Sequence, residues 1–176
     1  MSFKNTALLI IDMQAGSFLE EQPIYRTETL LNNIRLLIST AHDKGALIFL
    51  TKHNGKQGSL TEKGTTGWNI HPSLPLTGKE IIIEKNYPDS FHQTCLEQQL
   101  VANDIKRIII AGIQSEICVD ATCRRAYSIG YEVILVQDGH STKDSNVINA
   151  DQIINHHNQV MKDWFASTIV TKDIVL

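Results

Sequence analysis

The sequence has few cysteines, few aromatic residues and no long apolar run. Three of its 176 residues are cysteine, at positions 95, 118 and 123, and 6% are aromatic. An odd number of cysteines without a C-x-x-C pair argues against a disulfide framework, a zinc ribbon and a thioredoxin-like motif. The longest apolar stretch, within residues 107–113, falls far short of the roughly 20 residues that span a bilayer. Membrane-spanning and disulfide-rich classes are therefore excluded.

A basic surface is also missing. Lysine and arginine number 16 against 19 aspartates and glutamates, which gives a formal charge of -3, and the basic residues are scattered along the chain. A nucleic-acid-binding domain normally has a basic stripe, so we expect no nucleic-acid partner. The N-terminal residues lack a signal-peptide pattern, and we predict a cytoplasmic protein without membrane contact. The length predicts one domain over residues 1–176.

Short apolar runs alternate with helical periodicity along the chain. The runs predict strands at 6–11, 46–50, 80–84, 106–111 and 131–136 and a short edge strand at 167–170, and the periodic segments predict helices at 27–44, 92–103, 115–129 and 146–166. This alternation predicts a three-layer α/β/α sandwich around a six-stranded parallel sheet with strand order 3-2-1-4-5-6. Residues 53–79 hold five of the ten glycines and little periodicity, which indicates a long loop of functional or mobile character.

Three chemically active residues follow the carboxyl ends of predicted strands. Asp12 follows the first strand, Lys85 the third, and Cys118 lies in the first turn of the helix after the fourth. Ligands of such sheets bind at this edge, at the switch point between strands one and four. Each residue also has a plainer interpretation: a turn cap for Asp12, a solvated amine for Lys85 and core packing for Cys118. Cys95 and Cys123 are interpreted as structural.

The three residue types suit nucleophilic catalysis. A helix N-terminus and a nearby ammonium group both favour the reactive thiolate, so we expect Lys85 to lower the pKa of Cys118. Asp12 is suited to accept the thiol proton and to return it to a leaving amine. Backbone N–H groups in the turn before the helix are suited to hold an oxyanion.

Several stretches resemble the isochorismatase-like cysteine hydrolases. They are Leu9-Ile-Ile-Asp-Met-Gln14, Glu84-Lys85 and Ala111-Gly-Ile-Gln-Ser-Glu-Ile-Cys-Val119, with further matches at 67–72, 124–126, 130–131 and 138–142. The resemblance covers nearly the whole chain. It implies a catalytic triad of Asp12, Lys85 and Cys118, and a non-proline cis peptide between Ile113 and Gln114. The oxyanion would then rest on the N–H groups of Gln114 and Cys118. It also implies a small-molecule substrate, no cofactor and a homo-oligomer, either dimer or tetramer.

One departure from the family pattern bears on metal binding. Nicotinamidases of this superfamily carry an Asp-x-His metal motif after the second strand, whereas this chain has Thr51-Lys52-His53. His53 and His71 without a carboxylate make a weak metal site. We therefore predict no metal and a branch distinct from the nicotinamidases, with His53 hydrogen-bonded to a substrate or a loop.

The remaining candidates concern substrate binding. We predict that role for Gln14, Phe18, His53, Trp68, Phe91 and Glu116. Glu116 has the alternative of simply stabilising the helix N-terminus, and the pair His156-His157 is interpreted as a surface or subunit contact. The predicted reaction is hydrolysis of an amide, lactam or ureido C–N bond through a Cys118 thioester. The alternatives are isochorismate-type vinyl-ether hydrolysis and a non-catalytic binding protein on the same fold.

Overall fold

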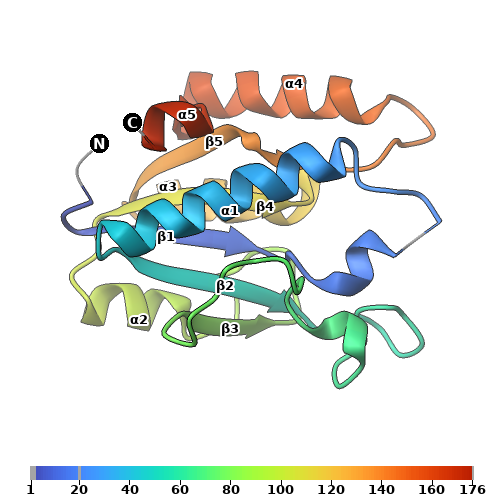
Figure 1. Cartoon of the computed structure of the whole chain (residues 1–176). Helices are drawn as coiled ribbons and strands as arrows, with labels where there is room; N and C mark the ends of the chain where they lie inside the picture. The colour runs from blue at the N-terminus through green and yellow to red at the C-terminus, as the bar shows by residue number, and fades with distance from the viewer. Residues whose placement is uncertain (1–2, 20, 176) are drawn as a thin grey trace.

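The computed structural model describes residues 3–19 and 21–175, and these form a parallel sheet between two helical layers (Figure 1). The six strands of the described chain have the order β3-β2-β1-β4-β5-β6, with every pair parallel. They are β1 (Thr6–Ile11), β2 (Leu47–His53), β3 (Ile81–Lys85), β4 (Arg107–Ile113), β5 (Glu132–Ser141) and β6 (Ser167–Ile169). The predicted fold class and strand order are confirmed.

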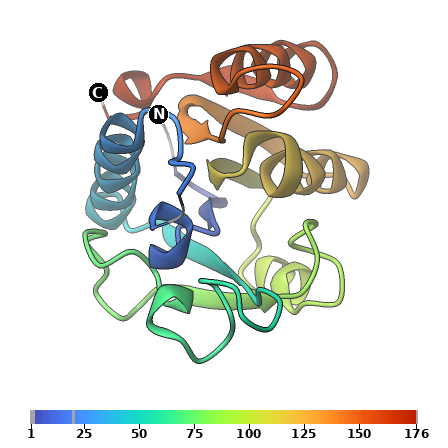
Figure 2. The same ribbon diagram turned by 90° about the vertical axis from the view of Figure 1, so that its right-hand side faces the viewer.

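Helices cover both faces of the sheet. They are α1 (Thr27–Asp43), α2 (Leu96–Ala102), α3 (Asp120–Ser128), α4 (Ala150–Val160) and α5 (Thr171–Val175). Figure 2, viewed at right angles to Figure 1, shows α1 on one side of the strands and α2 with α3 on the other. One core cluster joins α1 and α5 to the sheet, and a second joins α2 and α3 to its opposite face. No helix of the described residues is long and apolar enough to cross a membrane.

The burial of the strands explains their composition. All six residues of β1 are buried, because successive side chains point to opposite faces and both faces are covered by helices. Leu8 and Ile10 enter the cluster under α1, whereas Leu9 and Ile11 enter the cluster under α2 and α3. The sequence of such a strand is therefore a continuous apolar run and not an alternation of apolar and polar residues.

Several predicted boundaries were wrong. Strand β5 continues to Ser141 instead of ending at 136, because His140 and Ser141 still pair with β4 beyond a register shift between Ile110 and Gly112. The helix predicted at 115–129 begins as a π-helical turn, η3 (Ser115–Val119), and the last long helix ends in another, η4 (Met161–Phe165). The short helix α5 was not predicted. Apolar periodicity does not report polar strand ends or single π-helical turns.

Candidate active site

The strand register brings the predicted catalytic positions together. Ile11 pairs with Gly112 on β4, and His53 pairs with Lys85 on β3. Strands β1 and β4 approach closely at Gly112, where a Cβ atom would lie 2.2 Å from the carbonyl oxygen of Ile11. Gly112 also has φ +128, which disfavours other residues. Glycine therefore allows β4 to run beside β1 directly before the turn that carries Cys118.

Lys85 links the other two predicted triad members. Its Nζ lies 2.7 Å from Asp12 Oδ2 and donates a hydrogen bond to Cys118 Sγ at 3.3 Å. The same ammonium group donates to the carbonyl oxygens of Tyr87 at 3.1 Å and Pro88 at 3.3 Å. The whole residue is only 1% exposed. A buried ammonium needs such partners, so these four contacts fix its position between the carboxylate and the thiol.

Thr51 holds the Asp12 carboxylate from the opposite side. Its hydroxyl donates to Asp12 Oδ1 at 2.6 Å and accepts the backbone N–H of Asp12 at 3.0 Å. Asp12 has φ 51, a left-handed conformation that aspartate tolerates better than most residues. In the sequence, Thr51 was identified only as the residue that replaces a metal-binding carboxylate. The predicted pairing of the first two strands also places Thr51 close to Asp12.

The electrostatic environment of Cys118 differs from the predicted one. Burial first, and then the negative charge of Asp12, raise the pKa of the Cys118 thiol, whereas Lys85 lowers it by less, so that the net pKa is about 12. Lys85 does lower the Cys118 pKa as expected, but burial and the charge of Asp12 outweigh it, so the net shift is upward. The thiol is protonated at rest, with a carboxylate close enough to receive its proton.

The other two cysteines differ in burial. Cys123 is fully buried in the core under α3, and burial raises its pKa, so its structural interpretation is confirmed. Cys95 is exposed at the start of α2, so it is not part of the core, and it is absent from the lining of the cavity described below.

The turn before Cys118 has the predicted backbone geometry. The peptide between Ile113 and Gln114 is cis. The carbonyl oxygen of Gln114 accepts the N–H groups of both Ile117 and Val119, each at 3.1 Å. These bonds close the turn over residues 113–119, called the oxyanion turn after the role predicted for it.

A cavity of about 260 Å³ opens over the thiol. Its walls come from the ends of four strands and the loops between them. They comprise Asp12, Gln14, Ser17, His53, Thr61, Pro88, Ile113, Gln114, Ile117 and Cys118. Ser17, Thr61, Pro88 and Ile117 were not predicted, since they lie in loops or turns and match no chemical pattern. Thr61 is the contribution of the glycine-rich loop beyond His53.

Gln14 and His53 are joined at the rim of this cavity. Gln14 Oε1 accepts the N–H of His53 at 2.8 Å, and Gln14 Nε2 donates to the carbonyl oxygens of His53 and Trp68, each at 3.0 Å. Burial lowers the pKa of His53, and the charge of Lys85 lowers it further. His53 therefore presents a neutral imidazole, whose buried Nδ1 has no hydrogen-bond partner among the described residues.

Two predicted aromatic residues lie away from the cavity lining. Phe18 packs edge-on against His71, with ring centroids 5.0 Å apart. Phe91 is 7% exposed and belongs to the core cluster under α2 and α3. The structure therefore gives both residues packing roles in these positions.

Trp68 and Glu116 are also absent from the lining. The Trp68 ring lies under the Lys52 ammonium, 3.0 Å from ring centroid to Nζ, and its Nε1 donates to Asn54 at 2.9 Å. Glu116 Oε1 accepts from the hydroxyl of Thr142 at 2.8 Å, on the side of the turn facing β5.

The described residues do not fit a nicotinamidase-type metal. Thr51 stands where the carboxylate ligand would be, and its hydroxyl is bonded to Asp12. His71 is bonded to Ser73 at 2.8 Å. Within residues 3–19 and 21–175, no group of three or more histidine, cysteine, aspartate or glutamate side chains is placed to hold a metal ion.

The histidine pair of the last long helix contacts its own chain. His157 Nδ1 lies 3.1 Å from Asp120 Oδ1 on α3, and His156 stacks edge-on against His157. His157 thus joins α4 to α3, while His156 is exposed.

Several known proteins are similar to this chain over most of its length. Two streptothricin hydrolases from Streptomyces noursei are 30% and 31% identical over 138 residues, which is 78% of this chain. The chain spans about half the length of these relatives, 50% and 55%. Nicotinamidase 3 from Arabidopsis thaliana is 29% identical over 153 residues, 79% of this chain and 74% of that protein.

A solved structure and a family model extend the match to nearly the whole chain. The crystal structure of an isochorismatase from Pseudomonas putida KT2440 superposes with a TM-score of 0.91 at 30% identity, covering 98% of this chain and 91% of that one. The isochorismatase domain model matches residues 6–163. The names of these relatives indicate hydrolase chemistry for the family. The chain therefore belongs to the isochorismatase family.

Proposed function

We propose that this protein hydrolyses an amide, lactam or ureido C–N bond of a small molecule through a Cys118 thioester. The observation that carries the proposal is the contact of Lys85 with both Asp12 and Cys118 on the wall of one cavity. A nucleophile, a base and a group that orients both are the elements of covalent acyl transfer.

The raised pKa of the thiol defines the first step. Because Cys118 is protonated at rest, its Sγ attacks the carbonyl carbon as its proton passes to Asp12. Lys85 stabilises the sulfur and the carboxylate during this transfer through its contacts with both. The carbonyl oxygen gains negative charge, and the N–H groups of Gln114 and Cys118 stabilise it.

The second half of the reaction returns the proton. Asp12 donates it to the nitrogen of the breaking C–N bond; the amine or ammonia leaves, or, from a lactam, the freed amine stays attached to the ring-opened thioester. Asp12, again a carboxylate, then accepts a proton from water as the water oxygen attacks the thioester. The acid product leaves, and the thiol recovers its proton.

The cavity favours an uncharged substrate. Asp12 is the charged side chain among the described lining residues, and Lys85 directly below neutralises it. An anionic substrate would be desolvated there without a cation to meet it. The neutral imidazole of His53 and the amide of Gln114 offer hydrogen bonds instead. The names streptothricin hydrolase and ureidoacrylate amidohydrolase, carried by relatives 30% and 24% identical, support amide-type chemistry.

Vinyl-ether hydrolysis is the second candidate. It needs a proton donor near the substrate but no nucleophilic thiol, and the protonated resting state of Cys118 is compatible with it. The lack of an unpaired cation among the described lining residues disfavours isochorismate, a dicarboxylate. A non-catalytic binding role leaves the buried Asp12–Lys85 pair without a purpose.

A substrate panel tests the proposal. Small neutral amides, lactams and ureido compounds are incubated with the protein, and released amine or ammonia is measured. Cys118→Ala should abolish release from any substrate found, whereas Cys95→Ala, which removes an exposed thiol, should not. Unchanged turnover by Cys118→Ala would exclude the thioester mechanism.

A homo-oligomer remains part of the proposal. Ile117 lines the cavity and is 43% exposed, so a second subunit could cover this apolar residue and narrow the entrance. Light scattering after size-exclusion chromatography measures the assembly, and a monomer at micromolar concentration would contradict it.

A further inference from the structure

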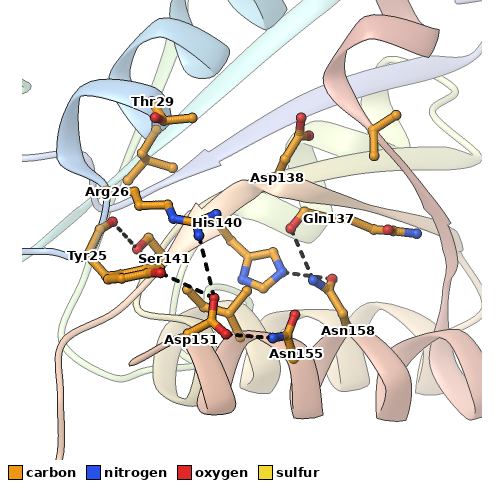
Figure 3. Close-up of a pocket in the computed structure, with 13 residues that line it drawn as sticks. Tyr25, Arg26, Thr29, Gln137, Asp138, His140, Ser141, Asp151, Asn155 and Asn158 are labelled. Carbon is orange, nitrogen blue, oxygen red and sulfur yellow. Dashed lines mark hydrogen bonds and ion pairs between the residues drawn. The ribbon is translucent and has the colours of Figure 1, made fainter. Parts of the chain in front are cut away.

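A second cavity lies near the end of β5 and shares no lining residue with the catalytic one (Figure 3). Its volume is about 250 Å³, and it opens between the start of α1, strand β5 and helix α4. Its polar side chains already satisfy one another. Asp151 accepts from the Tyr25 hydroxyl at 3.3 Å and from Asn155 at 3.0 Å, and lies 3.9 Å from Arg26. Because these polar groups already have partners within the protein, they do not indicate a ligand site. The cavity wall also contains a buried histidine.

That histidine, His140, is 3% exposed and hydrogen-bonded through both ring nitrogens. Its Nε2 lies 3.0 Å from Asn158 Oδ1, and its Nδ1 lies 2.7 Å from Ser115 Oγ. Asn158 Nδ2 donates to the carbonyl oxygen of Gln137 at 3.1 Å, which orients the amide (Figure 3).

The orientation of that amide assigns the histidine tautomer. Asn158 Oδ1 can only accept, so His140 Nε2 carries the hydrogen and donates it. Nδ1 is then an acceptor, and the Ser115 hydroxyl donates to it. Burial lowers the pKa of His140 to about 4, so the imidazole is neutral at physiological pH.

Ser115 connects this network to the catalytic machinery. It is the first residue of η3, follows Gln114 directly and precedes Cys118 by one turn. It is 1% exposed, so no solvent competes for its hydroxyl. The hydrogen bond to His140 ties the oxyanion turn to β5, and the bond to Asn158 ties it further to α4.

We propose that Ser115, His140 and Asn158 form a positioning chain that holds the oxyanion turn in its catalytic geometry. The inference rests on the proposed function for its kinetic consequence. None of the three residues lines the catalytic cavity, so they act through the turn and not on the substrate. Donors of an oxyanion hole must be held close to their working geometry, since misplacement by about 1 Å can cost roughly a hundredfold in rate.

Two serine variants separate positioning from general stability. Ser115→Ala removes the hydroxyl that bonds His140. Ser141→Ala is the matched control, because Ser141 is also buried at 3% and its hydroxyl donates to the Tyr25 carbonyl at 2.7 Å. Hydrogen–deuterium exchange of residues 113–119 should become faster in Ser115→Ala and stay unchanged in Ser141→Ala. The kcat should fall roughly ten- to a hundredfold in Ser115→Ala alone, at unchanged KM.

A double variant tests whether the residues act as one unit. His140→Leu should lower kcat at least as much as Ser115→Ala, and Ser115→Ala/His140→Leu should be no slower than His140→Leu. Additive losses would overturn the chain. Unchanged exchange of residues 113–119 in Ser115→Ala would overturn it as well, and so would faster exchange with an unchanged kcat. If the wild-type protein releases no amine from any compound of the panel, that result counts against the proposed function and not against the positioning chain. The hydrogen–deuterium exchange of Ser115→Ala and Ser141→Ala then tests the positioning chain without kinetics.

Discussion

The two cavities at the carboxyl edge of the sheet have almost the same volume, about 260 and about 250 Å³, and both are lined by polar side chains. They differ in how these side chains are partnered. In the cavity of Figure 3, Asp138 and Asp151 accept hydrogen bonds from neighbours, and none of the unpartnered buried side-chain atoms of the described residues belongs to its lining. In the catalytic cavity, His53 Nδ1 is unpartnered and a carboxylate–ammonium pair contacts one thiol.

This difference indicates where chemistry can occur. A satisfied polar network stabilises one conformation, whereas an ion pair directed at a nucleophile can move a proton. Cavity size by itself does not distinguish these cases.

Cys118→Ala should lower turnover of a C–N substrate at least about a thousandfold, because the thioester cannot form. Tyr25→Phe, which removes one hydrogen bond in the second cavity, should change turnover less than about twofold. Initial rates of amine release measure both. Similar losses in the two variants would remove the functional distinction between the cavities.

Lys85→Met should inactivate the protein and lower its free energy of unfolding by roughly 3–5 kcal/mol, since it leaves Asp12 buried and unpaired. The double variant Asp12→Asn/Lys85→Met removes that charge and should recover most of the stability but no activity. Urea unfolding and turnover measure these effects. A double variant as unstable as Lys85→Met would contradict the ion-pair argument.

Acid should destabilise the second cavity through His140. Its folded pKa of about 4 lies below the ordinary value of 6.5, owing first to burial, with His157 lowering it and Asn158 and Asp138 opposing. The unfolded chain therefore binds the proton more readily, and stability present above pH 6.5 is lost progressively towards pH 4. The loss attributable to His140 is about 3 kcal/mol.

The control for this prediction is His140→Asn, which lacks the titrating ring. Its free energy of unfolding, measured by urea titration between pH 6.5 and 4.5, should depend on pH less steeply than that of wild type. Parallel pH profiles for the two proteins would count against a buried neutral His140.

The rate at which each cysteine is alkylated should depend more on its exposure than on its catalytic role. At pH 7.5 iodoacetamide should label the exposed Cys95 faster than Cys118, whose raised pKa leaves little thiolate. Asp12→Asn removes a negative charge that raises the Cys118 pKa, so labelling of Cys118 should become several-fold faster. Peptide mass spectrometry quantifies each cysteine. Slower labelling of Cys118 in Asp12→Asn would reverse the assigned sign.

Much of the fold could be predicted because its signals are local. Apolar runs such as 6–11 identify strands covered on both faces, and the apolar spacing of 27–44 identifies α1. The polar end of β5 could not be found in this way. Residues 137–141 have no apolar pattern, and the strand is extended to Ser141 by the pairing of His140 and Ser141 with β4.

The residues that form the candidate site could be predicted from the sequence, but their electrostatic environment could not. Asp12 and Cys118 follow strand ends and Lys85 is the last residue of β3, and a parallel sheet of this order brings these ends together at one edge. The contacts of Thr51 with Asp12, of Lys85 with two carbonyl oxygens, and the burial of the thiol depend on side-chain packing. Burial, together with the charge of Asp12, reverses the expected direction of the Cys118 pKa shift.

By itself, the sequence determined the alternation of strands and helices, the strand order and the positions of the three reactive residues, because these follow from periodicity and from the handedness of crossovers. The tertiary structure decided which side chains are charged and which are fixed by hydrogen bonds to residues distant in the sequence. Asp12 and Thr51 are 39 residues apart, Lys85 and Cys118 are 33 apart, and Ser115 and His140 are 25 apart. Contacts over such separations exist only after the sheet has assembled and excluded water, and the same exclusion sets the protonation of Cys118 and His140.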